Sequence, residues 1–283
     1  MRAALVLPAV AILLYSGAAR GATPAPAAEI LNGDGLVFRY YPGYGYRFQP
    51  LLSFARLNRL VSARSVGPSR RLASALVVRG VRRGSTVYWQ YDFPYGGPVP
   101  WTSGFAQAVG AQALARAGVL VGSASFARVA EGAFHGLRQT LLMRLGGGLW
   151  VREYGFTNMA ILNAQLQSTL SLESYARVAE NAVAGRVAAA MYRAAYVLLP
   201  RFQVGCWSRY SLGGAAATTS YHAYHVELLR RLGLAHRSAP IWWSTYAAWS
   251  RCLGRRPDPR PPAAVVWRRG HAAVGGSASG WPP

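Results

Sequence analysis

Apolar residues recur at helical spacing in eight separate segments of this chain, and this pattern constrains the fold more than any other feature of the sequence. Recurrence every three to four residues places the apolar side chains on one face of a helix, and that face must be buried against another element. The segments are residues 50–64, 68–81, 103–117, 123–145, 158–172, 175–198, 218–233 and 238–252. The pattern predicts eight amphipathic helices and an all-α fold.

The helical segments are joined by short breaks that contain glycine or proline, residues that end helices. Aromatic segments with strand character lie between some of the pairs, at residues 36–41, 86–91, 149–154 and 203–210. Helix hairpins with extended connections fit either an (α/α) toroid or a helical solenoid. Because no strict sequence repeat is visible, we expect an (α/α) toroid of about four helical hairpins, with short strands in the connecting loops. A ligand site is then expected at one mouth of the ring, on these loops.

The two ends of the chain differ from the helical region. Arg2 precedes an apolar run over residues 3–15, and small residues follow up to position 22, an order typical of a secretory signal peptide. We expect a signal peptide over residues 1–22, a flexible lead-in over 23–35, the folded domain over 36–253 and a disordered, Pro-, Gly- and Arg-rich tail over 254–283. The apolar run is shorter than the roughly 20 residues that span a bilayer. The prediction is therefore a secreted or extracytoplasmic protein without stable membrane insertion after signal removal.

The two cysteines have two possible roles. Export to an oxidising compartment permits a disulfide between Cys206 and Cys252, whereas two buried thiols are the alternative, and the sequence leaves both open. Their spacing does not resemble a metal site. The chain also has no Gly-rich phosphate loop and no Gly-x-Ser-x-Gly elbow. The sequence therefore predicts neither a metal nor a cofactor.

The chain is strongly basic, with 31 arginines, no lysine and nine acidic residues, for a net charge of +22. Such a charge attracts polyanions, and guanidinium groups bind carboxylates and sulfates through paired hydrogen bonds. An arginine bias can also reflect genome composition. Because the chain is expected to be exported and its aromatic residues to line a cleft, the predicted partner is an anionic polysaccharide rather than nucleic acid. The oligomeric state stays open. A group of arginines is either a solvated face or a track for a sulfated chain: Arg70, Arg71, Arg79, Arg82 and Arg83.

Six short motifs occur in a fixed order along the chain. They are Q-Y-D-F-P at 90–94, P-W-T-S-G-F-A-Q at 100–107, W-V-R-E-Y at 150–154, I-L-N-A at 161–164, S-R-Y-S-L at 208–212 and Y-H-A-Y-H-V at 221–226. In this order they resemble motifs of the C-terminal domain of the D-glucuronyl C5-epimerase family. The residues at 40–44 and 49–50 are similar to those of bacterial members. The resemblance covers roughly residues 36–252.

The resemblance implies an (α/α) domain that inverts C5 of a uronic acid within a heparan-type polymer, converting D-glucuronate to L-iduronate. It implies three catalytic tyrosines, Tyr154, Tyr210 and Tyr221, with Glu153 as the neighbouring acid. The chain departs from the family pattern at three positions. Ser211 stands where the family has an acid, Gly213 where animal members have an arginine, and Ala164 where the family has a glycine.

The chemistry of the residues agrees with this interpretation. Removing a proton next to a carboxylate requires that the carboxylate be neutralised, and Arg152 and Arg209 each adjoin a motif tyrosine. A free phenol has a pKa of about 10, so a cationic neighbour is expected to favour the phenolate; Arg209, His222 and His225 are the candidates. Trp101, Gln107 and Asn163 complete the predicted substrate-binding set.

Each of these residues also has a structural alternative. The tyrosines, Trp101 and Gln107 could pack against their neighbours, and Glu153 could anchor an arginine. His222 and His225 lie one turn apart at the start of a predicted helix and could cap its first turn. These alternatives stay open at the level of sequence.

Two other functions are compatible with the sequence. A polysaccharide lyase removes the same C5 proton and then expels the 4-linked sugar, and the (α/α) toroid hosts such enzymes. An exported, non-catalytic glycan-binding protein is favoured if the changes at Ser211 and Gly213 have dismantled the site. A glycosidase is disfavoured, because most need two carboxylates and only Asp92 and Glu153 fall in the aromatic segments.

Overall fold

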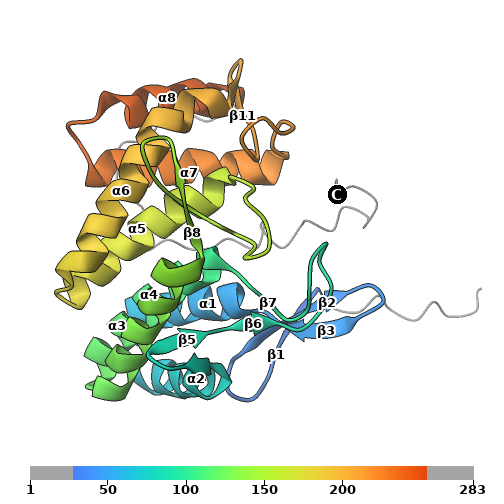
Figure 1. Ribbon diagram of the computed structural model, residues 1–283, viewed down its shortest axis with the longest axis vertical. Coiled ribbons are helices and arrows are strands. Elements are labelled where there is room, and N and C mark those ends of the chain that lie inside the picture. The colour runs from blue at the N-terminus through green and yellow to red at the C-terminus, as the bar shows by residue number, and fades with distance from the viewer. Residues whose placement is uncertain (1–27, 254–283) are drawn as a thin grey trace, which may run out of the picture.

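The computed structural model describes residues 28–253, so the predicted signal peptide and tail lie outside the described residues (Figure 1). The described part contains eight α-helices in four hairpins, which confirms the predicted (α/α) toroid architecture. The pairs are α1 (Pro50–Ser62) with α2 (Val66–Arg79), α3 (Gly104–Val121) with α4 (Ala124–Thr140), α5 (Leu162–Val178) with α6 (Ala182–Leu198), and α7 (Thr219–Ala235) with α8 (Pro240–Cys252). A short 3-10 helix, η1 (Leu199–Phe202), continues α6.

The odd-numbered helices pack side by side in chain order, α1 on α3, α3 on α5 and α5 on α7, while each even-numbered helix packs on the odd-numbered helix before it. In Figure 1 the first two hairpins form the lower half of the molecule and the last two form the upper half. Within residues 28–253 no extensive packing joins α7 back to α1. The hairpins therefore form an open arc of a toroid.

Short antiparallel strands occupy the connections between hairpins. A three-stranded sheet precedes α1, and two-stranded pairs precede the other odd-numbered helices. The strands are β1 (Glu29–Leu31), β2 (Val37–Tyr41), β3 (Gly45–Phe48), β4 (Val81–Arg83), β5 (Thr86–Tyr88), β6 (Gln90–Tyr91), β7 (Trp101–Thr102), β8 (Leu142–Leu145), β9 (Gly148–Val151), β10 (Gln203–Val204) and β11 (Trp207–Ser208). Part of the predicted lead-in is thus a strand, because β1 pairs with β2.

Two predicted helix boundaries are wrong for local reasons. The helix predicted over 123–145 ends at Thr140, because Gly146 and Gly147, with φ of 59° and 71°, form a two-residue turn that pairs β8 with β9. The helix predicted over 175–198 begins only at Ala182. Its cap is Asn181, whose side chain accepts a hydrogen bond from the Ala184 N–H.

The fourth residue of each odd-numbered helix is polar and binds the strand that precedes the helix. We call these four side chains the clamp residues. Each accepts a hydrogen bond from a backbone N–H in or beside a preceding strand: Ser53 from Val37 at 2.9 Å, Gln107 from Trp89, between β5 and β6, at 3.2 Å, Gln165 from Val151 at 2.8 Å and His222 from Ser208 at 3.1 Å.

Three of the clamp residues also reach the even-numbered helix of their own hairpin. The side-chain amide of Gln107 donates to the Ala133 carbonyl of α4 at 3.2 Å, and that of Gln165 donates to the Met191 carbonyl of α6 at 2.8 Å. His222 Nε2 lies 3.3 Å from the Trp249 carbonyl of α8. The same join between strand and two helices thus recurs through the fold, although the residue types differ.

The strand pairs and loops enclose an aromatic cluster beside the helices. Its buried members are Tyr91, Phe93 and Trp101, with Ala106 from α3. Partly buried aromatic residues pack around them, including Tyr41, Tyr95 and Tyr154. This cluster ties the β2–β3 and β6–β7 connections to the segment that follows β9.

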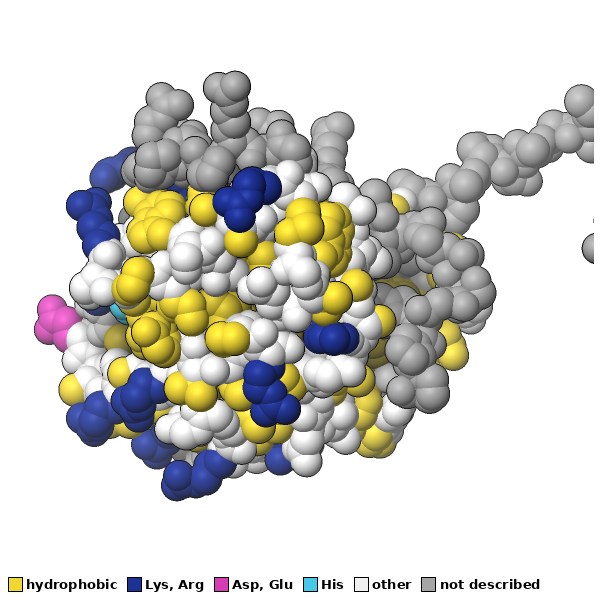
Figure 2. Space-filling model, turned by 90° about the horizontal axis from the view of Figure 1, so that it is seen from above, with side chains coloured by type: hydrophobic (Ala, Val, Ile, Leu, Met, Phe, Trp, Pro, Cys, Tyr) yellow, Lys and Arg dark blue, Asp and Glu magenta, His cyan; other side chains and the backbone are white. Residues whose placement is uncertain are grey.

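The segment Ala182–Phe202, which is α6 with η1, is long and apolar enough to cross a membrane, but 44% of its apolar window is buried inside the fold. It packs on α5 and β9, as a core helix does. Figure 2 shows the molecule from above, where basic side chains are spread between apolar patches and acidic ones appear only at the edge.

Candidate active site

Tyr154 follows β9, Tyr210 follows β11 and Tyr221 lies in the first turn of α7, and the three side chains meet at one place. The rings of Tyr210 and Tyr221 are 4.6 Å apart, and the Tyr210 phenol interacts by hydrogen bonding with those of Tyr154 and Tyr221. All three residues are partly exposed, although the hydroxyl oxygen of Tyr210 is itself sealed from solvent. The structure therefore brings together the three tyrosines that the family resemblance selected.

Backbone pairing fixes this meeting. The Leu162 N–H donates to the Tyr210 carbonyl at 3.0 Å, and the Leu212 N–H donates to the Ala160 carbonyl at 2.9 Å. On the other side, the Gly155 N–H donates to the Thr102 carbonyl at 2.8 Å. These bonds hold β7 and the segments after β9 and β11 next to one another.

Glu153 lies at the centre of the electrostatics of this cluster. Its Oε2 is sealed from solvent without a hydrogen-bond partner, and burial raises the pKa of the Glu153 carboxyl to about 8, against a smaller lowering by its hydrogen bond to Tyr154. Burial raises the pKa of Tyr154, Tyr210 and Tyr221, and the charge of Glu153 raises them further. The phenols are thus neutral in the free protein, contrary to the expectation that a cation would favour a phenolate. The group poised near neutral pH is the carboxyl of Glu153.

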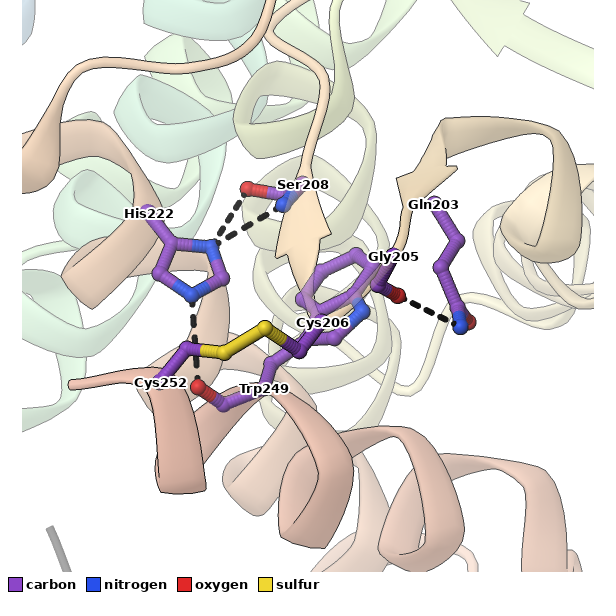
Figure 3. Close-up of a disulfide and its surroundings, with 7 residues drawn as sticks. All are labelled: Gln203, Gly205, Cys206, Ser208, His222, Trp249 and Cys252. Carbon is purple, nitrogen blue, oxygen red and sulfur yellow. Dashed lines mark hydrogen bonds between the residues drawn. A yellow bond between two sulfur atoms is a disulfide. The ribbon is translucent and has the colours of Figure 1, made fainter. Parts of the chain in front are cut away.

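His222 and His225 are not at this site, so their predicted role in substrate binding is wrong. Both are fully buried, and the Ser208 Oγ lies 2.8 Å from the Nδ1 of each. Figure 3 shows the contact of Ser208 with His222. Because the Ser208 N–H donates to His222 Nδ1, the proton of His222 is on Nε2, facing the Trp249 carbonyl. Burial lowers the pKa of both, that of His225 to about 3. The two imidazoles are neutral parts of the seam between α7 and α8.

Cys206 and Cys252 form a disulfide beside His222, which decides between the two alternatives for the cysteines (Figure 3). Their Cα atoms are 6.1 Å apart. The bond connects the turn between β10 and β11 to the last residue of α8.

Gln107 and Trp101 are packing residues. Gln107 is a clamp residue with no exposed surface, and both ends of its amide are bound to backbone, so its predicted role in substrate binding is wrong. Trp101 stacks on Tyr91 with ring centroids 4.0 Å apart, donates to the Phe93 carbonyl and presents its ring to Tyr154 at 5.6 Å. It therefore packs against the ring of Tyr154 and helps to position it.

The predicted arginines and Asn163 lie close in sequence to the phenols but differ in their contacts. Arg209 donates to the Gly214 carbonyl at 2.6 Å and so holds its own loop. Arg152 Nε and Asn163 Oδ1, like Glu153 Oε2, are buried without a hydrogen-bond partner. Buried polar atoms without partners are costly, and several within one short segment indicate a place where a ligand completes the hydrogen bonding.

Sequence reasoning missed Tyr95, Tyr41 and Arg39. The ring of Tyr95 lies 5.4 Å from that of Tyr154, and the two phenols share a hydrogen bond. Tyr41 packs on Phe93 at 4.2 Å, and Arg39 precedes it by two residues on the same strand. All three fall in or beside the aromatic segments, and that position was the available signal.

Residues 83–251 match the family model of the D-glucuronyl C5-epimerase C-terminus. This match spans more than half of the chain and contains Glu153 and the three tyrosines. The chain belongs to the D-glucuronyl C5-epimerase C-terminal family. No curated protein matches this family member significantly.

Solved structures with similar folds come from enzymes that act on glycans. The endo-β-1,4-glucanase CMCax of Acetobacter xylinum aligns with a TM-score of 0.56 at 14% identity, over 76% of this C5-epimerase family chain and 72% of its own. The family 8 endoglucanase Cel10 of Klebsiella pneumoniae gives 0.56 at 11% identity, over 78% and 75%. The GH76 α-mannanase of Bacteroides thetaiotaomicron gives 0.52 at 13% identity, over 76% and 63%. At these identities the likeness shows the (α/α) toroid fold.

Proposed function

We propose that this chain is a C5-epimerase of uronic acid residues in an anionic polysaccharide, of the type that converts D-glucuronate to L-iduronate. The observation that carries the proposal is the meeting of three phenols around the buried carboxyl of Glu153. Epimerisation needs a base on one face of the sugar and an acid on the other. Tyr154, which follows β9, and Tyr210 or Tyr221, which lie around the start of α7, can supply both.

The residues take roles that follow from their contacts. The ionised Glu153 accepts the phenolic proton of Tyr154 through their hydrogen bond, and Tyr154 then takes the C5 proton of the sugar. The electron pair moves into the uronate carboxyl group as the enolate forms. Tyr210 or Tyr221 returns a proton to the opposite face of C5. The C5–H bond is broken and formed again on the opposite face, but no glycosidic bond is broken, so the chain length is unchanged.

The partner and compartment belong to the same proposal. A net charge of +22 favours an anionic polymer by long-range attraction. The disulfide between Cys206 and Cys252 fits the oxidising compartment of a secreted or extracytoplasmic protein.

Deuterium exchange tests the proposal. In deuterated water with a glucuronate polymer, the protein should place deuterium at C5 without shortening the chain. Tyr210→Phe and Tyr221→Phe keep the packing but remove the phenol, so exchange should fall on the order of 100-fold. Tyr196→Phe, at an exposed position on α6, is the matched control and should leave exchange unchanged.

Two results would contradict this proposal. Unsaturated products that absorb in the near ultraviolet would identify a lyase. Binding of the polymer without exchange would identify a non-catalytic glycan-binding protein.

A further inference from the structure

The β2–β3 hairpin turns one face toward the aromatic loop that leads to the phenols. Side chains alternate along a strand, so Arg39 and Tyr41 of β2 share a face with Arg47, the register partner of Arg39 on β3. This face contacts the loop twice. Arg47 lies 3.7 Å from the Asp92 carboxylate, and the Tyr41 ring lies 4.2 Å from that of Phe93.

Arg39 is held in this face by two neighbours. Its Nε and one terminal nitrogen donate to the same oxygen of Glu29 on β1, at 3.2 and 2.6 Å. Arg39 also hydrogen-bonds to the Tyr41 phenol. Its side chain still keeps 30% of its surface exposed. A guanidinium that is oriented by these hydrogen bonds and still partly exposed to solvent can bind a second carboxylate.

A continuous path of rings connects Arg39 to the catalytic phenols. Beyond Tyr41 and Phe93, the Phe93 ring lies 6.3 Å from Tyr95, and Tyr95 lies 5.4 Å from Tyr154. Burial has the largest effect on the pKa of Tyr221 and of Tyr95 and raises both, while the positive charge of Arg39 lowers both. The charge of Arg39 therefore acts on Tyr221, one of the three phenols, and on Tyr95, which packs against Tyr154.

Arg152 and Arg209, the arginines that the sequence predicted to neutralise the uronate carboxylate, make other contacts than Arg39 does. Arg209 is bound to the Gly214 carbonyl. Arg152 is partly buried, and its Nε is sealed from solvent without a hydrogen-bond partner.

We propose that Arg39, oriented by Glu29, binds the carboxylate of the uronate that the site turns over; this assignment rests on the proposed function. As the C5 proton leaves to the base, its electron pair spreads onto the carboxyl oxygens, which then carry two negative charges. A bidentate guanidinium stabilises that charge where it develops. Glu29 acts as a positioning residue, because its bond fixes the plane of the guanidinium.

The test compares two ligands and two arginines. The ligands are an unsulfated oligosaccharide of alternating glucuronate and N-acetylglucosamine, and the same oligosaccharide with its carboxyl groups reduced to alcohols. Arg47→Ala is the matched control, because its side chain is 35% exposed against 30% for Arg39. Calorimetry gives the affinity of each variant for each ligand, and circular dichroism verifies folding.

The unmodified protein and Arg47→Ala should both prefer the carboxylate ligand. Arg39→Ala should lose about 10- to 100-fold in affinity for it and bind the reduced ligand as before, because a hydrogen bond to a charged group is worth roughly 1.5–3 kcal/mol. Arg39→Lys, which preserves the charge, should restore part of the preference and covers the case in which Arg39→Ala does not fold. Glu29→Gln should weaken the carboxylate preference without abolishing it.

A carboxylate preference that survives in both Arg39 variants would overturn the assignment, as would its absence in the unmodified protein. The epimerase proposal is judged separately by exchange at C5. If the preference depends on Arg39 and no exchange occurs, the carboxylate site stands and epimerisation fails. If exchange occurs and is unchanged in Arg39→Ala, epimerisation stands and the role of Arg39 fails.

Discussion

Among single residues, Glu153 links the geometry of the site to its dependence on pH. Its carboxyl is buried beside three phenols, and burial raises its pKa to about 8. A catalytic base works best when its pKa lies near the working pH. The tyrosines alone do not meet that condition, since burial moves their pKa values above the ordinary value of about 10.

The pH profile of exchange follows from this pKa. With Glu153 as the base, kcat/KM for C5 exchange should rise about tenfold per pH unit below pH 8 and level off above it. Glu153→Gln should lower exchange and remove this limb. A profile that stays the same in Glu153→Gln would assign the base to another group.

The pH dependence of thermal stability tests the raised pKa of Glu153 independently of catalysis. The pKa of the Glu153 carboxyl is higher in the folded protein than in the unfolded one. The neutral carboxyl therefore contributes fully to the free energy of unfolding below about pH 4.5, and this contribution is lost as the pH rises through about 8. Glu153→Gln cannot ionise. Its melting temperature relative to the unmodified protein should therefore increase across this interval and stay level beyond it.

The sequence predicts residues of the site only where a motif carries them. Tyr154, Tyr210 and Tyr221 were found because they stand in family motifs. The sequence could not distinguish the structural residues His222 and His225 from these site residues. A single sequence does not show that His225 contacts Ser208 and that His222 contacts the Trp249 carbonyl in the interior. Arg39 was missed because only the pairing of β2 with β1 and β3 places it beside the aromatic loop.

At the level of elements, the clamp residues explain how different sequences build the same hairpin. The polar side chain at the fourth position of the helix hydrogen-bonds to a backbone N–H in or beside a preceding strand. In three cases it also contacts a backbone carbonyl of the even-numbered helix. The acceptor is a hydroxyl in Ser53, an amide in Gln107 and Gln165, and an imidazole in His222. Because the residue types differ, a comparison of the sequence segments cannot detect this repeat. Helical spacing predicted the hairpins, whereas the strands β1, β3, β4, β7 and β8 were not predicted.

Removing one clamp should destabilise the whole domain. Gln165→Met leaves the Val151 N–H and the Leu149 and Met191 carbonyls without their partner, and the unfolding free energy should fall by about 3 kcal/mol. Gln203→Met, on an exposed strand, loses one bond to Gly205 and should change it by less than about 0.5 kcal/mol. Equal midpoints for the two variants in urea would show that the clamps are dispensable.

For the whole molecule, the arc explains how distant segments reach one site. Consecutive odd-numbered helices lie side by side, so the connections before them gather at the same end of the helices, and β7 and the residues after β9 and β11 become neighbours. The toroid class followed from helix pairing in the sequence. That the described hairpins stop short of a closed ring did not follow, because no local pattern encodes how many hairpins complete a circle.

The disulfide also determines how this protein would respond to mechanical force. It joins residues 46 positions apart, so tension on residue 252 passes directly to residue 206 and bypasses α7 and α8. Pulled from its two ends, the oxidised chain should extend about 160 Å less than the reduced chain, at about 3.5 Å per residue. Single-molecule force spectroscopy with and without reductant measures this difference, and equal contour lengths would show that the last hairpin unravels freely.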